Sequence, residues 1–223
     1  VVNNEIGAIS KHLIADISFL MRNIRFIENH DEPRAATSIG TERSRPIMAL
    51  LATLPGALLL HDGQFVGRRT KLPVQISRQP DERLHPALKE YYIRVLAEAQ
   101  HDIYKTGEWW FLETLPACEG CEGHENVIAH GWRGDNEARL IISNLSGQWS
   151  QVAVDLGYWL DFLRESDWHA HDVLNDHSTE WSGDDLDELG GLSVELAPYN
   201  AMIYQLTPLP KQEKRRLRNR KRT

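Results

Sequence analysis

The chain has 223 residues, 41% of them hydrophobic and seven of them Trp, a composition typical of a globular protein with a sizeable core. No apolar run reaches the roughly 18 residues of a membrane helix, and two cysteines are too few for a disulfide framework. The net charge is −7, but eight Lys and Arg lie in the last thirteen residues, so the rest of the chain carries −14. Such an acidic body is a poor surface for nucleic acid, because phosphate binding needs cations.

The first half of the sequence alternates helix and strand. Apolar residues in three- and four-residue steps predict a helix over residues 5–21. A strand at 25–28 follows, and then a helix at about 44–53 with Pro46 in its first turn. The strand at 57–60 is apolar throughout, which indicates a parallel strand covered on both faces. With a helix at about 82–104, this order predicts a parallel α/β layer, although two strands cannot close a barrel of about 250 residues.

Three polar residues follow the first strand: Asn29, His30 and Asp31. Pro33 lacks an N–H and prevents the strand from continuing. An acidic group at the end of a strand is where α/β barrels keep their chemistry. The alternative is that Asn29 and Asp31 only open a turn, since both are ordinary turn formers.

The second half has the pattern of short strands separated by turns. Residues 127–132 and 139–145 read as strands joined by a turn at 134–136, and further strands are expected at 151–156, 192–196 and 201–206. Short strands at this spacing suggest an antiparallel sandwich. The predicted domains are therefore an α/β part at 1–116, a linker at 117–125, a β-sandwich at 126–210 and a basic disordered tail at 211–223.

The stretch Phe26-Ile27-Glu28-Asn29-His30-Asp31 resembles the Phe-x-x-Asn-His-Asp motif of the α-amylase family (glycoside hydrolase family 13), and the next residues, through Arg34, are also similar to that family. Residues 53–64 resemble the family's eighth barrel strand and its loop, except at Gln64, where many relatives carry a glutamate. Residues 144–146 and 196–204 are similar to the β domain that follows the barrel. The resemblance implies the C-terminal portion of a (β/α)8 barrel followed by an antiparallel β-sandwich.

In that family, the motif's carboxylate stabilises the transition state of glycoside cleavage. The resemblance therefore implies that Asp31 is the transition-state stabiliser and that His30, Asn29 and Arg34 contact an α-glucan or a similar maltooligosaccharide. The nucleophile and the acid/base would come from the fourth and fifth strands, which precede this segment. The chain begins at Val1 rather than Met, so we expect a piece of a longer retaining hydrolase or transglycosidase that is inactive alone.

Other readings are possible. A barrel relative that only binds carbohydrate would keep Asp31 but lose the two upstream carboxylates, and a nucleic-acid adaptor would act through residues 211–223. No metal or cofactor is expected in this segment, although calcium could bind elsewhere in the parent. Neither nucleic acid nor a membrane is an expected partner. The missing signal peptide favours the cytoplasm, but a signal could precede Val1.

Three further patterns invite function. The sequence Cys118-x-x-Cys121-x-x-His124 offers three ligands where structural zinc takes four, so an ordinary loop is the better reading. The pair His169 and His171 on a probable strand could bind a metal or simply line a strand edge. The aromatic cluster at 109–111 could stack on sugars, but we expect it to seal a helix against the β domain.

Overall fold

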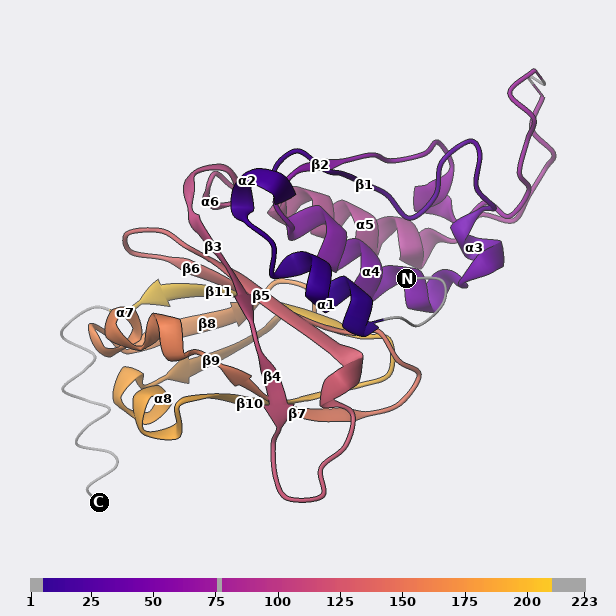
Figure 1. The fold of residues 1–223 in the computed structure, drawn as a ribbon. Coiled ribbons are helices and arrows are strands. Elements are labelled where there is room, and N and C mark those ends of the chain that lie inside the picture. The colour runs from indigo at the N-terminus through magenta and orange to yellow at the C-terminus, as the bar shows by residue number, and fades with distance from the viewer. Residues whose placement is uncertain (1–5, 76–77, 210–223) are drawn as a thin grey trace.

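The computed structural model describes residues 6–75 and 78–209, which form a helical layer with a two-stranded sheet, packed on a β-sandwich of two further sheets (Figure 1). The predicted basic tail at 211–223 lies outside the described residues. The helices are α1 (Ile6–Leu13), α2 (Ile17–Leu20), α3 (Ala35–Ser38), α4 (Thr41–Thr53), α5 (Pro86–Glu98), α6 (Ile103–Thr106), α7 (Leu160–Arg164) and α8 (Gly183–Leu189). None of these described helices combines the length and the apolar character needed to cross a membrane.

The predicted α/β part contains a two-stranded parallel sheet of β1 (Ile24–Arg25) and β2 (Ala57–Leu58), in which Ile24 pairs with Ala57. Both strands are shorter than the predicted 25–28 and 57–60. The expectation that the second strand is covered on both faces was wrong, because Ala57 and Leu59 are exposed. A parallel sheet is normally buried on both faces. The described residues leave part of this two-stranded sheet open to solvent.

The helices of this part differ from the sequence pattern in three places. The predicted helix at 5–21 is broken into α1 and α2, because the Asp16 side chain accepts the Ser18 N–H at 2.8 Å and caps a new helix. Helix α4 begins at Thr41, so Pro46 lies inside the helix rather than in its first turn as predicted. The predicted helix at 82–104 is divided into α5 and α6.

The β part is an antiparallel sandwich, as predicted. Its larger sheet has the order β3-β5-β6-β11-β8-β9 and its smaller sheet the order β10-β7-β4. The strands are β3 (Glu108–Leu112), β4 (Thr114–Pro116), β5 (Val127–Arg133), β6 (Ala138–Asn144), β7 (Ser150–Asp155), β8 (Trp168–Asp172), β9 (His177–Trp181), β10 (Gly191–Leu196) and β11 (Ala201–Pro208). Since β3 pairs with β5 and β4 with β7, the sandwich already begins at Glu108, before the predicted boundary at 116.

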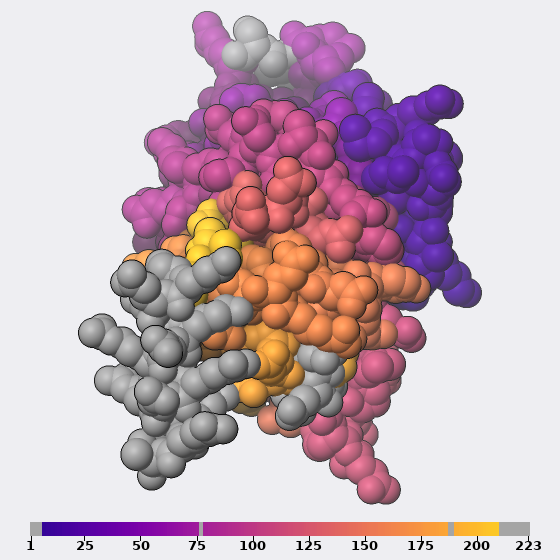
Figure 2. Space-filling model, turned by 90° about the vertical axis from the view of Figure 1, so that its left-hand side faces the viewer, coloured from indigo at the N-terminus to yellow at the C-terminus, as the bar shows by residue number. Residues whose placement is uncertain are grey.

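The larger sheet is buried on both faces, and this holds the two parts together. On one face, Met48 and Ala49 of α4 and Tyr92 of α5 pack against residues that include Ile141 and Ile203. The other face forms a second core with the smaller sheet and with α7. In Figure 2 the N-terminal residues, in indigo, lie above and beside the β-domain residues, in orange and yellow. The helical layer therefore shares its core with the β domain.

Polar contacts also join the two parts. The indole N–H of Trp132 on β5 donates to Thr53 O at the end of α4, at 2.7 Å. Glu98 at the end of α5 pairs with Arg139 on β6 at 2.7 Å, and both side chains are buried. Charges buried in this way need a partner and further hydrogen bonds. Glu98 also accepts bonds from Tyr104 and Gln205, so its carboxylate is well satisfied.

Candidate functional site

The candidate site lies just beyond the carboxyl ends of β1 and β2, in the residue stretches 26–34 and 59–71. Backbone pairing ends at Arg25 and Leu58, and the Leu59 N–H still donates to Arg25 O at 2.8 Å. Parallel strands bring their carboxyl ends to the same edge of a sheet, so residues 33 positions apart in sequence meet here, as Glu28 and His61 do.

A buried ion pair supports the site from below. Glu28 is only 1% exposed, and its Oε1 lies 3.1 Å from Arg34 Nε. Its Oε2 accepts the Ala35 N–H at 2.5 Å, at the start of α3. The imidazole Nδ1 of His61 lies 3.2 Å from Glu28 Oε1 and 2.8 Å from Arg34 Nη1. These contacts fix the loop after β1 to the loop after β2.

Arg34 donates most of its N–H groups to protein atoms. Besides Glu28, it bonds Asp62 O through Nη2 at 2.7 Å and Arg68 O through Nε at 3.4 Å, and it is 5% exposed. A small cavity of about 70 Å³ lies beside it, lined in part by His61, Arg68 and Glu82. The geometry therefore gives Arg34 a positioning role under the site. Its predicted contact with a substrate stays a prediction.

Asn29 shapes the turn that carries the two exposed site residues. Its Oδ1 accepts the backbone N–H of Asp31 at 2.8 Å and that of Glu32 at 3.0 Å. Asn and Asp side chains commonly bond the backbone a few residues ahead in this way. The turn-forming reading of Asn29 is therefore confirmed, while its predicted contact with a sugar stays untested.

His30 and Asp31 stand at the surface above this support. Asp31 Oδ2 lies 3.3 Å from His30 Nε2, and the side chains are 79% and 63% exposed, respectively. The Lys71 ammonium reaches across from the loop after β2 and donates to Asp31 O. A carboxylate and an imidazole, side by side and open to solvent, can accept and donate hydrogen bonds to the hydroxyl groups of a ligand.

The sequence missed Glu28 and His61. Glu28 stands in an otherwise apolar strand end, which was the one available signal, because an acidic residue is almost never fully buried unless it is paired. The partner could not be found from spacing alone. His61 follows the second strand, but nothing local showed that its imidazole faces Glu28.

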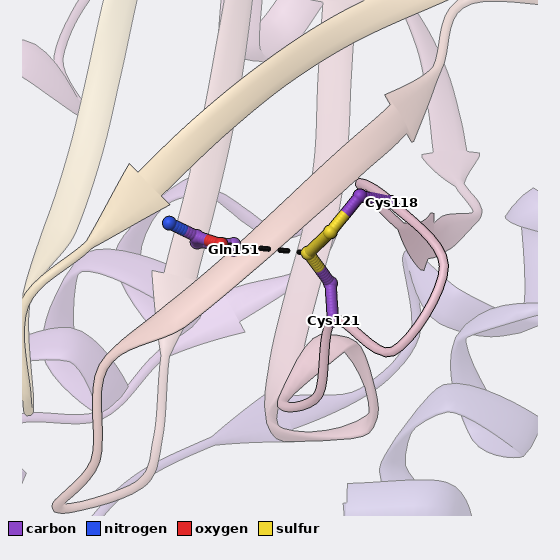
Figure 3. Close-up of a disulfide and its surroundings, with 3 residues drawn as sticks. All are labelled: Cys118, Cys121 and Gln151. Carbon is purple, nitrogen blue, oxygen red and sulfur yellow. Dashed lines mark hydrogen bonds between the residues drawn. A yellow bond between two sulfur atoms is a disulfide. The ribbon is translucent and has the colours of Figure 1, made fainter.

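Neither of the two sequence patterns considered as metal ligands forms a metal site among the described residues. Cys118 and Cys121 form a disulfide with a Cα–Cα distance of 5.2 Å, and Gln151 Oε1 lies 3.4 Å from the Cys121 sulfur (Figure 3). The expected ordinary loop is thus a cross-linked turn. The rings of His169 and His171 are parallel, with centroids 6.5 Å apart. Among the described residues, no group of three or more His, Cys, Asp or Glu is placed to hold a metal ion.

The aromatic side chains at 109–111 point alternately to the two faces of β3, as expected for a strand. Trp109 and Phe111 pack with Leu13 of α1 and Ile128 of β5, so they seal a helix against the β domain as predicted. Trp110 instead stacks on Tyr158, with ring centroids 4.9 Å apart.

Comparison with known proteins agrees with this architecture. No family model matches the sequence. The chain is 28% identical over 132 residues to the α-amylase MalA of Haloarcula japonica, which covers 59% of this chain and 19% of that protein. The maltogenic α-amylase AmyB of Thermotoga neapolitana superposes with a TM-score of 0.61 at 20% identity, over 84% of this chain and 42% of that one.

Two further solved structures superpose over 92% of this chain. They are an Anoxybacillus α-amylase (TM-score 0.67, 16% identity, 42% of its length) and the α-amylase of Geobacillus thermoleovorans in complex with acarbose (TM-score 0.66, 15% identity, 43% of its length). The chain thus spans about a fifth of the curated relative and about two fifths of these structures.

The fold and the strand-end site together define the class: the end of a (β/α)8 barrel followed by an antiparallel β domain. The resemblance to the α-amylase family noted in the sequence agrees with these comparisons. The chain is similar in sequence to part of the α-amylase MalA, and its fold is similar to the C-terminal part of the α-amylase structures.

Proposed function

We propose that the protein containing this segment is a retaining glycoside hydrolase or transglycosidase that acts on α-glucans. Solved structures of similar fold include an α-amylase in complex with acarbose and the protein AmyP in complex with maltose and with maltotriose, which supports this substrate class. Cleavage of a glycosidic bond passes through an oxocarbenium-like transition state and needs two carboxyl groups. In this proposal both come from barrel strands outside the 223 residues, and the segment alone is inactive.

Asp31 is the third carboxylate in this proposal. Positive charge develops on the sugar ring in the transition state, so a fixed anion beside the ring binds the transition state more strongly than the substrate. His30 donates a hydrogen bond to a sugar hydroxyl at the cleavage point. Asn29 and Arg34 act mainly by fixing the turn and the loop beneath it. Any direct contact of theirs with the sugar would add to that role.

One observation carries the proposal. The two residues that would meet the sugar, His30 and Asp31, are solvent-exposed neighbours 3.3 Å apart, while the Glu28–Arg34 pair that supports them is buried. A rigid support with an open functional group is the arrangement that catalysis requires.

The test is Asp31→Asn in the full-length protein, with Glu32→Gln as the matched control. Both side chains are exposed, and both substitutions remove one negative charge from the same turn. We expect Asp31→Asn to lower turnover of maltooligosaccharides by about 10²–10³, the effect typical of losing one preorganised electrostatic group. Glu32→Gln should retain activity within about twofold, since it removes no group that the proposal places at the sugar.

Two results would refute the proposal. Turnover by Asp31→Asn within a few-fold of the unsubstituted protein would remove Asp31 from the chemistry. Turnover by the 223-residue segment alone, lost in Asp31→Asn, would show that the segment does not depend on outside carboxylates. Binding of maltooligosaccharides without any turnover by the full-length protein would instead favour the non-catalytic relative.

A further inference from the structure

A much larger cavity lies away from the strand-end site, between the first helices and the β domain. Its volume is about 690 Å³, within the range of small-molecule binding sites. One wall is formed by α1 and the start of α2, and the other by β3, the start of β4 and the end of β7. None of the residues that line it belongs to the stretches 26–34 or 59–71, so it is separate from the candidate active site.

An aromatic platform stands in this groove. The rings of Trp110 and Tyr158 are stacked, with centroids 4.9 Å apart and planes 20° from parallel. Tyr158 is 69% exposed, so its outer face is open. The next residue, Trp159, is fully buried in the sandwich core and anchors the short helical turn that carries Tyr158. The ring is therefore held in place before any ligand arrives, which lowers the entropy cost of binding.

Hydrogen-bond acceptors flank the platform. Asp155 N–H, at the end of β7, donates to Glu113 O at 2.9 Å, which places Asp155 beside Glu113 in the connection between β3 and β4. Asp155 Oδ1 accepts the Gly157 N–H at 2.7 Å, and this bond orients the carboxylate next to Tyr158. Thr114 also lines the groove, but its hydroxyl donates to the backbone oxygen of His124 at 3.2 Å. An open aromatic face edged by carboxylates suits a ligand with an apolar face and a rim of hydroxyl groups.

The charge of the groove narrows the choice of ligand. The described polar lining includes two carboxylates and no Lys or Arg. A phosphorylated sugar, a nucleic acid or an anionic lipid surface would therefore meet repulsion rather than attraction. A neutral sugar ring suits both the aromatic face and the carboxylates of the groove. Its C–H face can stack on an aromatic ring, and its hydroxyls can donate to carboxylates.

We propose that this groove is a second carbohydrate site that binds an α-glucan chain through one sugar ring stacked on Tyr158. The identity of the glucan rests on the proposed function, whereas the site itself rests on the platform and its carboxylates. Binding one polymer at two places on the same molecule raises the effective concentration of its chain at the active site. The groove should therefore favour long substrates and have no effect on short ones.

The experiment measures the affinity of the full-length protein for soluble amylopectin by electrophoresis in gels that contain it. Tyr158→Ala removes the exposed platform, and Trp149→Ala is the matched control, since Trp149 is an exposed aromatic of the β domain outside the groove. We expect Tyr158→Ala to weaken binding at least tenfold and Trp149→Ala to leave it unchanged. Asp155→Asn, which keeps the acceptor for Gly157, should weaken binding several-fold.

Catalytic turnover is measured separately from binding in the groove. Asp31→Asn should leave amylopectin binding through the groove in place, and Tyr158→Ala should leave turnover of maltotriose unchanged while raising KM for amylopectin. Tyr158-dependent binding in a protein without turnover would refute the proposed function but support the groove. Turnover that depends on Asp31, with amylopectin binding unaffected by Tyr158→Ala, would overturn the groove alone.

Other occupants of the groove give distinct results. If a preceding segment of the full-length protein filled it, Tyr158→Ala would change the unfolding temperature but not the binding of amylopectin. If a second copy of the chain filled it, Tyr158→Ala would dissociate a dimer measured by sedimentation. Either result would overturn the carbohydrate site, as would equal retention by a β-linked glucan of similar length.

Discussion

His130 offers the sharpest test of how the helical layer is joined to the β domain. It lies on β5 with no exposed surface, and its Nε2 is 3.1 Å from Thr53 Oγ1 at the end of α4. The Thr53 hydroxyl already donates to Ala49 O at 2.7 Å, so it can only accept from the imidazole. His130 Nδ1 is buried and has no partner among the described residues. A second proton on this ring would therefore be buried without a hydrogen bond.

Burial, helped by the nearby Arg25 guanidinium, lowers the pKa of His130 from 6.5 to about 3. In the unfolded chain the pKa returns to about 6.5, so the unfolded state binds one more proton between these two pH values. A depressed folded pKa gives stability that is present above pH 6.5 and is lost as the pH falls toward 3. The slope in that window is about 1.4 kcal/mol per pH unit. From pH 7 to pH 5 this one group should cost about 2 kcal/mol.

The assay is urea unfolding of the protein and of His130→Gln at pH 7, 6 and 5. Gln keeps a donor for Thr53 but cannot be protonated, so its stability should fall less steeply with acid. We expect the gap between the two proteins to narrow by about 2 kcal/mol from pH 7 to pH 5. His177→Gln, at an exposed histidine, should run parallel to the unsubstituted protein. Parallel curves for His130→Gln would refute the reasoning.

The remaining predictions concern stability and are measured by the free energy of unfolding. Glu28→Gln should cost about 3–5 kcal/mol because it leaves a buried guanidinium unpaired, while Glu42→Gln, from an exposed pair, should cost less than about 1 kcal/mol; equal losses would contradict this. Removing the Cys118–Cys121 disulfide should cost only about 2 kcal/mol, because the disulfide closes a four-residue loop. A loss above about 4 kcal/mol would contradict this dependence on loop length. Gly131→Ala should cost at least 1–3 kcal/mol, because its Cβ would stand 2.2 Å from the buried Trp159 ring; a neutral result would show that the ring can move.

The sequence predicted most of the fold because hydrophobic periodicity reflects which faces are buried. The parallel pair of strands, the helices α4 and α5 and the main strands of the sandwich were all found in this way. The errors fall where a local polar contact overrides the periodicity. Asp16 caps a new helix inside an apolar repeat, and this contact ends the predicted helix at 5–21. The strands β3 and β4 were missed because their partners, β5 and β7, lie further along the chain.

The site was predictable in its exposed half only. Asn29, His30 and Asp31 stand together in the sequence, so their joint position at a strand end could be predicted from three letters and a following proline. The buried half depends on pairing between β1 and β2, which brings His61 to Glu28. Sequence spacing carries no information on such a contact. For the same reason Arg34 was assigned to the substrate, although its partners are protein atoms.

This division has a consequence for how substitutions in the site should behave. Glu28 and Arg34 contribute to folding because they are buried and paired, so changing them alters stability first and activity only through the shape of the turn. Asp31 is exposed and takes no part in the core, so changing it should alter activity and leave stability unaffected. Glu28 and Arg34 each lie three positions from Asp31 on one loop. Separate effects of their substitution on stability and on activity would therefore show that the loop has a supporting side and a reacting side.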